Sequence, residues 1–204
     1  MEGVNGMSNT ASQPETYKAP STKISLGFWI YLMTDCLLFA TLFATYAVLK
    51  NSTNGGVGGK DIFELPYVLV ETVLLLTSSL TAGLMFLSAK YRDRVKTLLF
   101  LGLTMILGMA FLGMEIHEFS KLVADGNNWQ ASAFLSSYFT LVGTHGLHIL
   151  IGLIWAAVLI GVLIEKGLNK TLFKRLMLFS LFWHFLDIVW IFIFSVVYLV
   201  GAGS

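Results

Sequence analysis

The sequence has few charged residues and few residues that interrupt a helix. Asp, Glu, Lys and Arg make up 12% of the 204 residues, whereas soluble domains contain about 25%. Three prolines occur, two near the N-terminus and the third at Pro66, so the interiors of the apolar segments contain no helix breaker. Hydrophobic residues reach 56%. This composition excludes a water-soluble globule and indicates an integral membrane protein.

Two further scarcities narrow the chemistry. Cys36 is the only cysteine, so the chain can form no internal disulfide and has no second thiol for a metal site. Thirteen Lys and Arg residues are balanced by twelve Asp and Glu residues. No basic excess is left to hold a polyanion, which excludes nucleic acid as a partner.

Five stretches have the length of membrane-spanning helices, which need about 20 mainly apolar residues. They cover residues 26–49, 66–89, 97–119, 134–164 and 176–199. Such long apolar runs lack the alternation of membrane β-strands, which excludes a barrel. The sequence therefore predicts an all-α polytopic membrane protein, a bundle of five transmembrane helices over residues 26–204. Residues 1–25 are polar and lack the apolar stretch of a signal peptide, so we expect a disordered tail.

Lysine and arginine are divided unequally between the two sets of loops. The N-terminal tail and the loops after the second and fourth spans hold ten of these residues, and the opposite side holds three, namely Lys50, Lys60 and Lys121. Cytoplasmic loops of membrane proteins carry the excess of basic residues. We therefore predict a cytoplasmic N-terminus and a C-terminus that faces outward.

Several ionisable side chains fall inside the predicted spans, where they are costly and count as functional candidates facing the bundle interior. They are Asp35, Glu71, Glu115, Glu118, His145, His148, His184 and Asp187. At about 1.5 Å per residue, Asp35 lies roughly 14 Å and Asp187 roughly 17 Å from the cytoplasmic ends of their helices. By the same rise, His145 and His148 lie about 17 to 21 Å from the outer end of theirs. These groups share one central layer, and we expect a contact between Asp35 and His148.

The central layer allows three interpretations. Polar groups hydrogen-bonded between helices can simply hold the register of the bundle. A buried carboxylate beside an imidazole can handle protons, because imidazole titrates near neutral pH. Three mid-membrane histidines can instead supply axial ligands to a haem.

Other residues are expected nearer the outer surface or between helices. Glu115 and Glu118 are interpreted as an interfacial helix end, and Glu71, about 8 Å from the outer end of its span, as a residue that water reaches. Trp183 and Trp190 are seven apart, on one helix face, which favours a helix–helix seam or a lipid-filled groove.

Several segments resemble subunit III of the haem-copper respiratory oxidases. The two signature segments are GTHGLHILIG, at residues 143–152, and FWHFLD, at residues 182–187. The first span, KDIFELPYVLVETVLLL and FLGMEIHEF are similar to the five-helix form of bacterial cytochrome bo-type ubiquinol oxidases. The resemblance covers nearly everything after the N-terminal tail.

The resemblance implies a subunit in the bacterial cytoplasmic (inner) membrane with no activity of its own. Haems and copper would belong to the partner catalytic subunit I, with subunit II and a small subunit IV as further partners. The complex would oxidise quinol, reduce oxygen to water and pump protons. This subunit would stabilise the catalytic one, could assist proton uptake, and could bind phospholipid as longer members do in a cleft between two helix bundles.

The resemblance also implies roles for single residues. Asp35 stands at the position of a buried carboxylate, and His148 at that of the histidine thought to face it. A structural polar layer would comprise His145, His184, Asp187, Glu71 and Glu118. No catalytic or metal-binding residue is implied. A rival from another class is a free-standing transporter of protons or solutes, but the chain shows no inverted repeat and no pair of interrupted helices.

Overall fold

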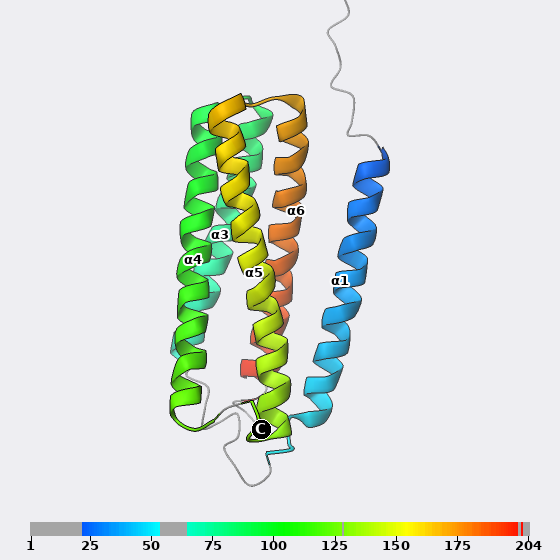
Figure 1. The fold of residues 1–204 in the computed structure, drawn as a ribbon, viewed down its shortest axis with the longest axis vertical. Coiled ribbons are helices and arrows are strands. Elements are labelled where there is room, and N and C mark those ends of the chain that lie inside the picture. The colour runs from blue at the N-terminus through cyan, green and yellow to red at the C-terminus, as the bar shows by residue number, and fades with distance from the viewer. Residues whose placement is uncertain (1–21, 54–64, 128, 200, 202–204) are drawn as a thin grey trace, which may run out of the picture.

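A computed structural model of the chain describes residues 22–53, 65–127, 129–199 and 201. These residues contain no β-strand. They form α1 (Thr22–Leu49), α3 (Leu65–Lys90), α4 (Arg94–Ala124), α5 (Ala133–Lys166), α6 (Lys170–Ile193) and a closing π-helix, η1 (Phe194–Leu199). The five long helices are apolar enough to cross a membrane, and successive helices run antiparallel (Figure 1). The predicted all-α fold with five membrane-spanning helices is confirmed.

The helices extend beyond the spans that hydropathy indicates. Helix α4 runs to Ala124 rather than residue 119, and α6 begins at Lys170 rather than residue 176. Three helices begin at a capping side chain that accepts a backbone N–H three residues further on: Asp93 ahead of α4, Ser132 ahead of α5 and Asn169 ahead of α6. Such caps start a helix in polar sequence, before its apolar part. Of the predicted tail, residues 22–25 belong to α1, and residues 1–21 lie outside the described residues.

At the start of α4, the hydrogen bond of this cap also affects an ionisable group. Asp93 Oδ1 lies 3.1 Å from the Lys96 backbone nitrogen. Because the N–H donates to the charged carboxylate, the pKa of Asp93 lies below its ordinary value. The cap therefore acts on α4 in its ionised form at neutral pH.

Four helices make the core of the molecule, and α1 lies along its side. Figure 1 shows α3, α4, α5 and α6 gathered into one bundle, while α1 packs on α5 and to a smaller extent on α6. On α1 the buried apolar residues are Leu32, Phe39 and Tyr46, each seven residues from the next. This spacing places them in one narrow stripe, as in a coiled-coil seam. Several other apolar residues of α1, among them Met33, Leu37 and Val48, are exposed.

The Trp183 side chain of α6 touches each of the other core helices. Its indole N–H donates to Ser78 Oγ of α3 over 2.8 Å, and its ring is 1% exposed. A Cβ built at Gly108 of α4 would lie 2.9 Å from the ring, and one at Gly152 of α5 would lie 2.8 Å from it. The indole therefore fits only because both helices lack a side chain there. Trp190 donates to Thr72 of α3, so the two tryptophans form a seam between helices.

We expect Gly152→Ala to lower the free energy of unfolding by about 1–3 kcal/mol, because the new methyl group would overlap the Trp183 ring. Gly161→Ala in the same helix is the matched control. No atom lies within 4 Å of a Cβ built there, and alanine favours a helix more than glycine does. The measurement is the unfolding midpoint of each variant in detergent. Equal losses in the two variants would contradict this account of the Trp183 seat.

Candidate functional site

The carboxylate of Asp35 on α1 lies against His148 on α5. His148 Nε2 is 3.0 Å from Asp35 Oδ1, and His148 Nδ1 is 2.7 Å from the carbonyl oxygen of Thr144. A carbonyl oxygen only accepts, so Nδ1 must carry a hydrogen. The contact between Nε2 and Oδ1 then needs one further proton, carried either by the imidazole or by the carboxyl group. The pair is therefore built to share a proton.

Asp35 and His148 are largely shielded from water. Asp35 is 6% exposed, and the His148 side chain is 13% exposed. The ring of Phe39, one turn after Asp35 on α1, lies 5.3 Å from the imidazole ring. Among the described residues Asp35 Oδ2 has no hydrogen-bond partner. Removing either member of the pair would leave the other buried without its partner, which is costly.

His145 lies one turn from His148 but in a different environment. It is fully buried, and its ring lies 5.3 Å from Trp190 and 6.0 Å from Phe111. Phe39 closes a third side at 6.3 Å. Within the part of the chain that the structure describes, neither ring nitrogen of His145 has a hydrogen-bond partner. His145 is thus enclosed by aromatic rings and takes no part in the contact with Asp35.

His184 and Asp187 form a second polar region, between α6 and α3. His184 Nδ1 lies 2.6 Å from the carbonyl oxygen of Ser180, and its Nε2 faces Gly83 of α3. Asp187 is hydrogen-bonded to Ser79 of α3. The central layer that the sequence indicates is therefore divided into two regions. One joins α1 to α5, and the other joins α6 to α3.

Two glutamates lie deeper than the sequence indicates. Glu71 is fully buried and Glu115 is 3% exposed. The predictions of an interfacial helix end at Glu115 and of water access at Glu71 are wrong. Helix α4 continues to Ala124, which places Glu115 about 14 Å inside its end. The Glu115 carboxylate lies against the backbone of α5 at Gly146, where an added Cβ would come within 2.5 Å of Oε1.

Glu118 is held by two tyrosine hydroxyls. The Tyr138 hydroxyl on α5 donates to Glu118 Oε1 over 3.1 Å, and the Tyr198 hydroxyl on η1 donates to Oε2 over 3.4 Å. The two hydroxyl oxygens are 3.0 Å apart. In the sequence, Tyr138 stands seven residues before His145, hence on the same helix face. For Tyr198 no such signal exists, because the π-helix turn changes the periodicity before it.

This geometry does not support the interpretation of the mid-membrane histidines as haem ligands. Both ring nitrogens of His148 are engaged, and His145 and His184 belong to separate regions. In residues 22–53, 65–127 and 129–199, no group of three or more His, Cys, Asp and Glu residues is placed to hold a metal ion. The imidazoles of His148 and His184 are each bonded within their own region instead of converging on a shared space.

Polar contacts between five long apolar helices define the class of the protein, a helical integral membrane protein whose helices are joined by buried hydrogen bonds. Within that class, residues 7–202 match the model of the family described as cytochrome c oxidase subunit III. The chain belongs to the cytochrome c oxidase subunit III family.

Relatives with different named electron donors are similar to the chain over most of its length. It is 60% identical to cytochrome bo(3) ubiquinol oxidase subunit 3 of Pseudomonas aeruginosa, over 86% of this chain and 84% of the relative. It is 47% identical to cytochrome c oxidase subunit 3 of Bacillus sp. strain PS3, over 86% and 85%. It is 42% identical to quinol oxidase subunit 3 of Bacillus subtilis, over 95% and 96%.

We expect Asp35→Ala and His148→Ala to be non-additive in the free energy of unfolding, with a coupling of about 0.5–3 kcal/mol. Each single change already breaks the contact, so the second change removes little more. The measurement is a double-mutant cycle by unfolding in detergent.

The matched control for this cycle combines Asp35→Ala with His184→Ala. His184 is bonded within α6 and faces α3, so these two changes should add within about 0.5 kcal/mol. Additivity in the Asp35 and His148 cycle itself would rule out an energetic role for the contact.

Proposed function

We propose that the chain is the non-catalytic subunit III of a proton-pumping terminal oxidase that oxidises quinol and reduces oxygen to water. The observation that carries this proposal is the family match over residues 7–202, joined with the 60% identity to a ubiquinol oxidase subunit 3. The complex would lie in a bacterial inner membrane, since the relatives are bacterial and five helices are apolar enough to span a bilayer. Haems and copper would be held by the catalytic subunit.

The proposed role is to support the catalytic subunit. The outward face of α1 is apolar, with Met33 64% and Leu37 67% exposed. A face of this kind fits a helix that lies against lipid or another membrane subunit. Subunits I, II and IV of the oxidase are the proposed partners. The polar layer of His145, His184, Asp187, Glu71 and Glu118 would stabilise the bundle that presents α1.

The proposed orientation places the N-terminus in the cytoplasm and the C-terminus outside. The turn between α3 and α4 and the turn between α5 and α6 lie at the end of the bundle from which α1 starts (Figure 1). Both turns are flanked by basic residues, including Lys90, Arg92 and Lys170. This distribution supports a cytoplasmic location of that end.

The proposed further role of Asp35 and His148 is to assist proton uptake. Their contact contains one proton that either group can carry, and it lies between the outermost helix and the core. The support for this proposal is the shared proton. In a site with little water, interactions with neighbouring polar groups are strong enough to decide which group carries it.

We expect the tagged chain to purify from its native membrane, in mild detergent, together with haem-containing subunits and quinol-driven oxygen consumption. When the chain is stripped from that complex, it should be colourless and inactive. The measurement combines the haem spectrum, the subunit bands and oxygen uptake of one sample. A chain that purifies alone would overturn the proposal in favour of a free-standing transporter, and one that stays red alone would return the histidines to the role of haem ligands.

We expect Asp35→Asn to slow proton uptake during turnover, because the amide can still hydrogen-bond to His148 but cannot exchange the shared proton. Asp187→Asn is the matched control, since that carboxyl group belongs to the separate region between α6 and α3. The measurement is the rate of proton uptake by the intact oxidase, followed with a pH indicator. Unchanged rates of proton uptake in both variants would mean that the Asp35 contact has a purely structural role.

A further inference from the structure

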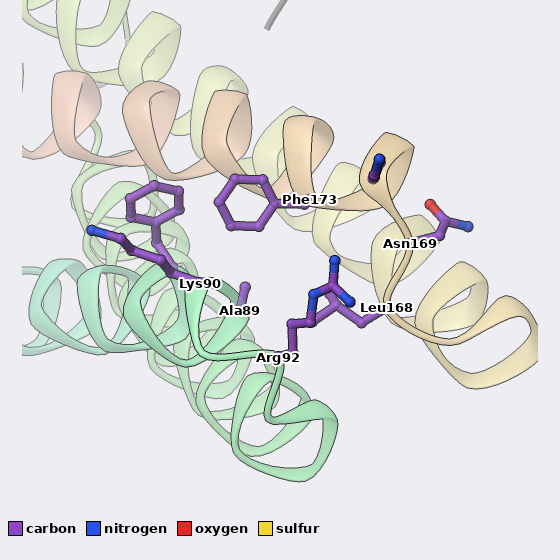
Figure 2. A pocket seen from close by; sticks show the side chains of 8 residues that line it. Ala89, Lys90, Arg92, Leu168, Asn169 and Phe173 are labelled. Atoms are coloured by element: carbon purple, nitrogen blue, oxygen red, sulfur yellow. The ribbon is translucent and has the colours of Figure 1, made fainter. Parts of the chain in front are cut away.

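A cavity of about 720 Å³ opens between the end of α3 and the start of α6. Its lining residues are Phe86, Ala89, Lys90, Arg92, Leu168, Asn169, Lys170 and Phe173. Figure 2 shows the Arg92 guanidinium group projecting into the space between the end of α3 and the segment that leads into α6. Three of the residues are cations, and the described residues that line the cavity include no acid. The cavity therefore favours an anion.

One wall of the cavity is apolar. The rings of Phe86 on α3 and Phe173 on α6 lie 5.6 Å apart. Ala89, a third apolar lining residue, is 1% exposed. A small hydrated anion gains no binding free energy from an apolar wall, and the volume of the cavity exceeds that of one phosphate ion. The combination fits an amphiphile with a negative headgroup and an acyl chain.

Arg92 reaches the cavity from a backbone conformation that disfavours it. Its φ angle is +59°, in the left-handed region, which costs free energy for any residue except glycine. The turn is the usual end of a helix, with the Asp93 N–H donating to Ser88 O and the Arg92 N–H to Ala89 O, both at 3.1 Å. Glycine is the common residue at this position. An arginine at this position makes the turn less stable than a glycine would, and it places a guanidinium group at the cavity.

We propose that this cavity binds an anionic phospholipid, with Arg92 on the phosphate and an acyl chain along Phe86 and Phe173. Arginine binds phosphate through two parallel hydrogen bonds, and basic pockets between transmembrane helices on the cytoplasmic side bind anionic headgroups. The cavity lies at the end of α3 and the start of α6, both apolar enough to span a membrane, where a bilayer would place its headgroups. None of the described side chains of α1 lines it. The inference rests on the membrane location in the proposed function and is independent of the electron donor.

The test uses the oxidase complex that contains the full chain, purified in mild detergent and studied by native mass spectrometry. Dioleoyl phosphatidylglycerol is titrated against dioleoyl phosphatidylcholine, which has the same chains and no net charge. We expect phosphatidylglycerol to bind about tenfold more tightly, because the choline ammonium of phosphatidylcholine offsets the phosphate charge and is repelled by the lining cations, whereas the glycerol headgroup is uncharged. Inorganic phosphate in excess should not displace it. Equal binding of the two lipids, or displacement by phosphate alone, would overturn the proposal.

Arg92→Gly and Arg92→Asn are the decisive variants. Both remove the charge and favour the left-handed turn, so the fold should be kept or improved while phosphatidylglycerol binding falls about tenfold. Arg92→Lys should retain part of the binding. The matched control is Arg175→Gln, which removes an exposed cation of α6 outside the cavity. Equal affinities in the Arg92 and Arg175 variants would refute the site.

The same spectra separate this inference from the proposed function. The masses of the subunits report whether the chain assembles with a haem-containing oxidase, and the masses of the retained lipids report the cavity. A complex that assembles normally but shows no dependence on Arg92 would refute the lipid site alone. A chain that fails to assemble but retains phosphatidylglycerol through Arg92 would support the lipid site and refute the oxidase subunit.

Discussion

The packing of the core depends on the seat of Trp183. In lipid, helices gain little from hiding apolar surface from one another, so close approach and hydrogen bonds between helices decide how they associate. Gly108 and Gly152 remove the side chains that would block the indole, and Ser78 accepts its N–H. The close approach of α4 and α5 continues at Gly146, where the Glu115 carboxylate lies directly on the α5 backbone. Glu115 is therefore accommodated in the same way as the tryptophan, by a glycine on the facing helix.

The attachment of α1 follows a different principle. Its seam contains Leu32, Phe39 and Tyr46 at a spacing of seven residues, and these apolar residues alone would tolerate sliding by one heptad. Asp35 is the polar member of the seam, and its bond to His148 is possible in one register. A single polar residue in an apolar seam fixes register at some cost in stability. The pair thus positions α1 whether or not it also moves protons.

How far the sequence predicts this structure depends on the range of each interaction. Helix number and type follow from long apolar runs, and the meeting of Asp35 with His148 follows from depth in the bilayer, because antiparallel helices bring equal depths together. The burial of Glu115 does not follow, because its contact with the α5 backbone at Gly146 decides it. The position of Tyr198 beside Glu118 does not follow either, because the π-helix changes the periodicity by which residues are assigned to helix faces. The left-handed Arg92 is likewise set by its turn.

The state of the Asp35 and His148 pair depends on what covers α1. A carboxylate facing an imidazolium is stabilised where water reaches the edge of the contact, whereas the neutral acid and imidazole are favoured where water is excluded. Asp35 itself is 6% exposed, while Met33 and Leu37 beside it are mostly exposed. Lipid or a partner subunit on that outer face would exclude water from the contact between Asp35 and His148 without touching either side chain. The outer face of α1 and the contact between Asp35 and His148 are therefore coupled through the water that either reaches or does not reach the edge of the contact.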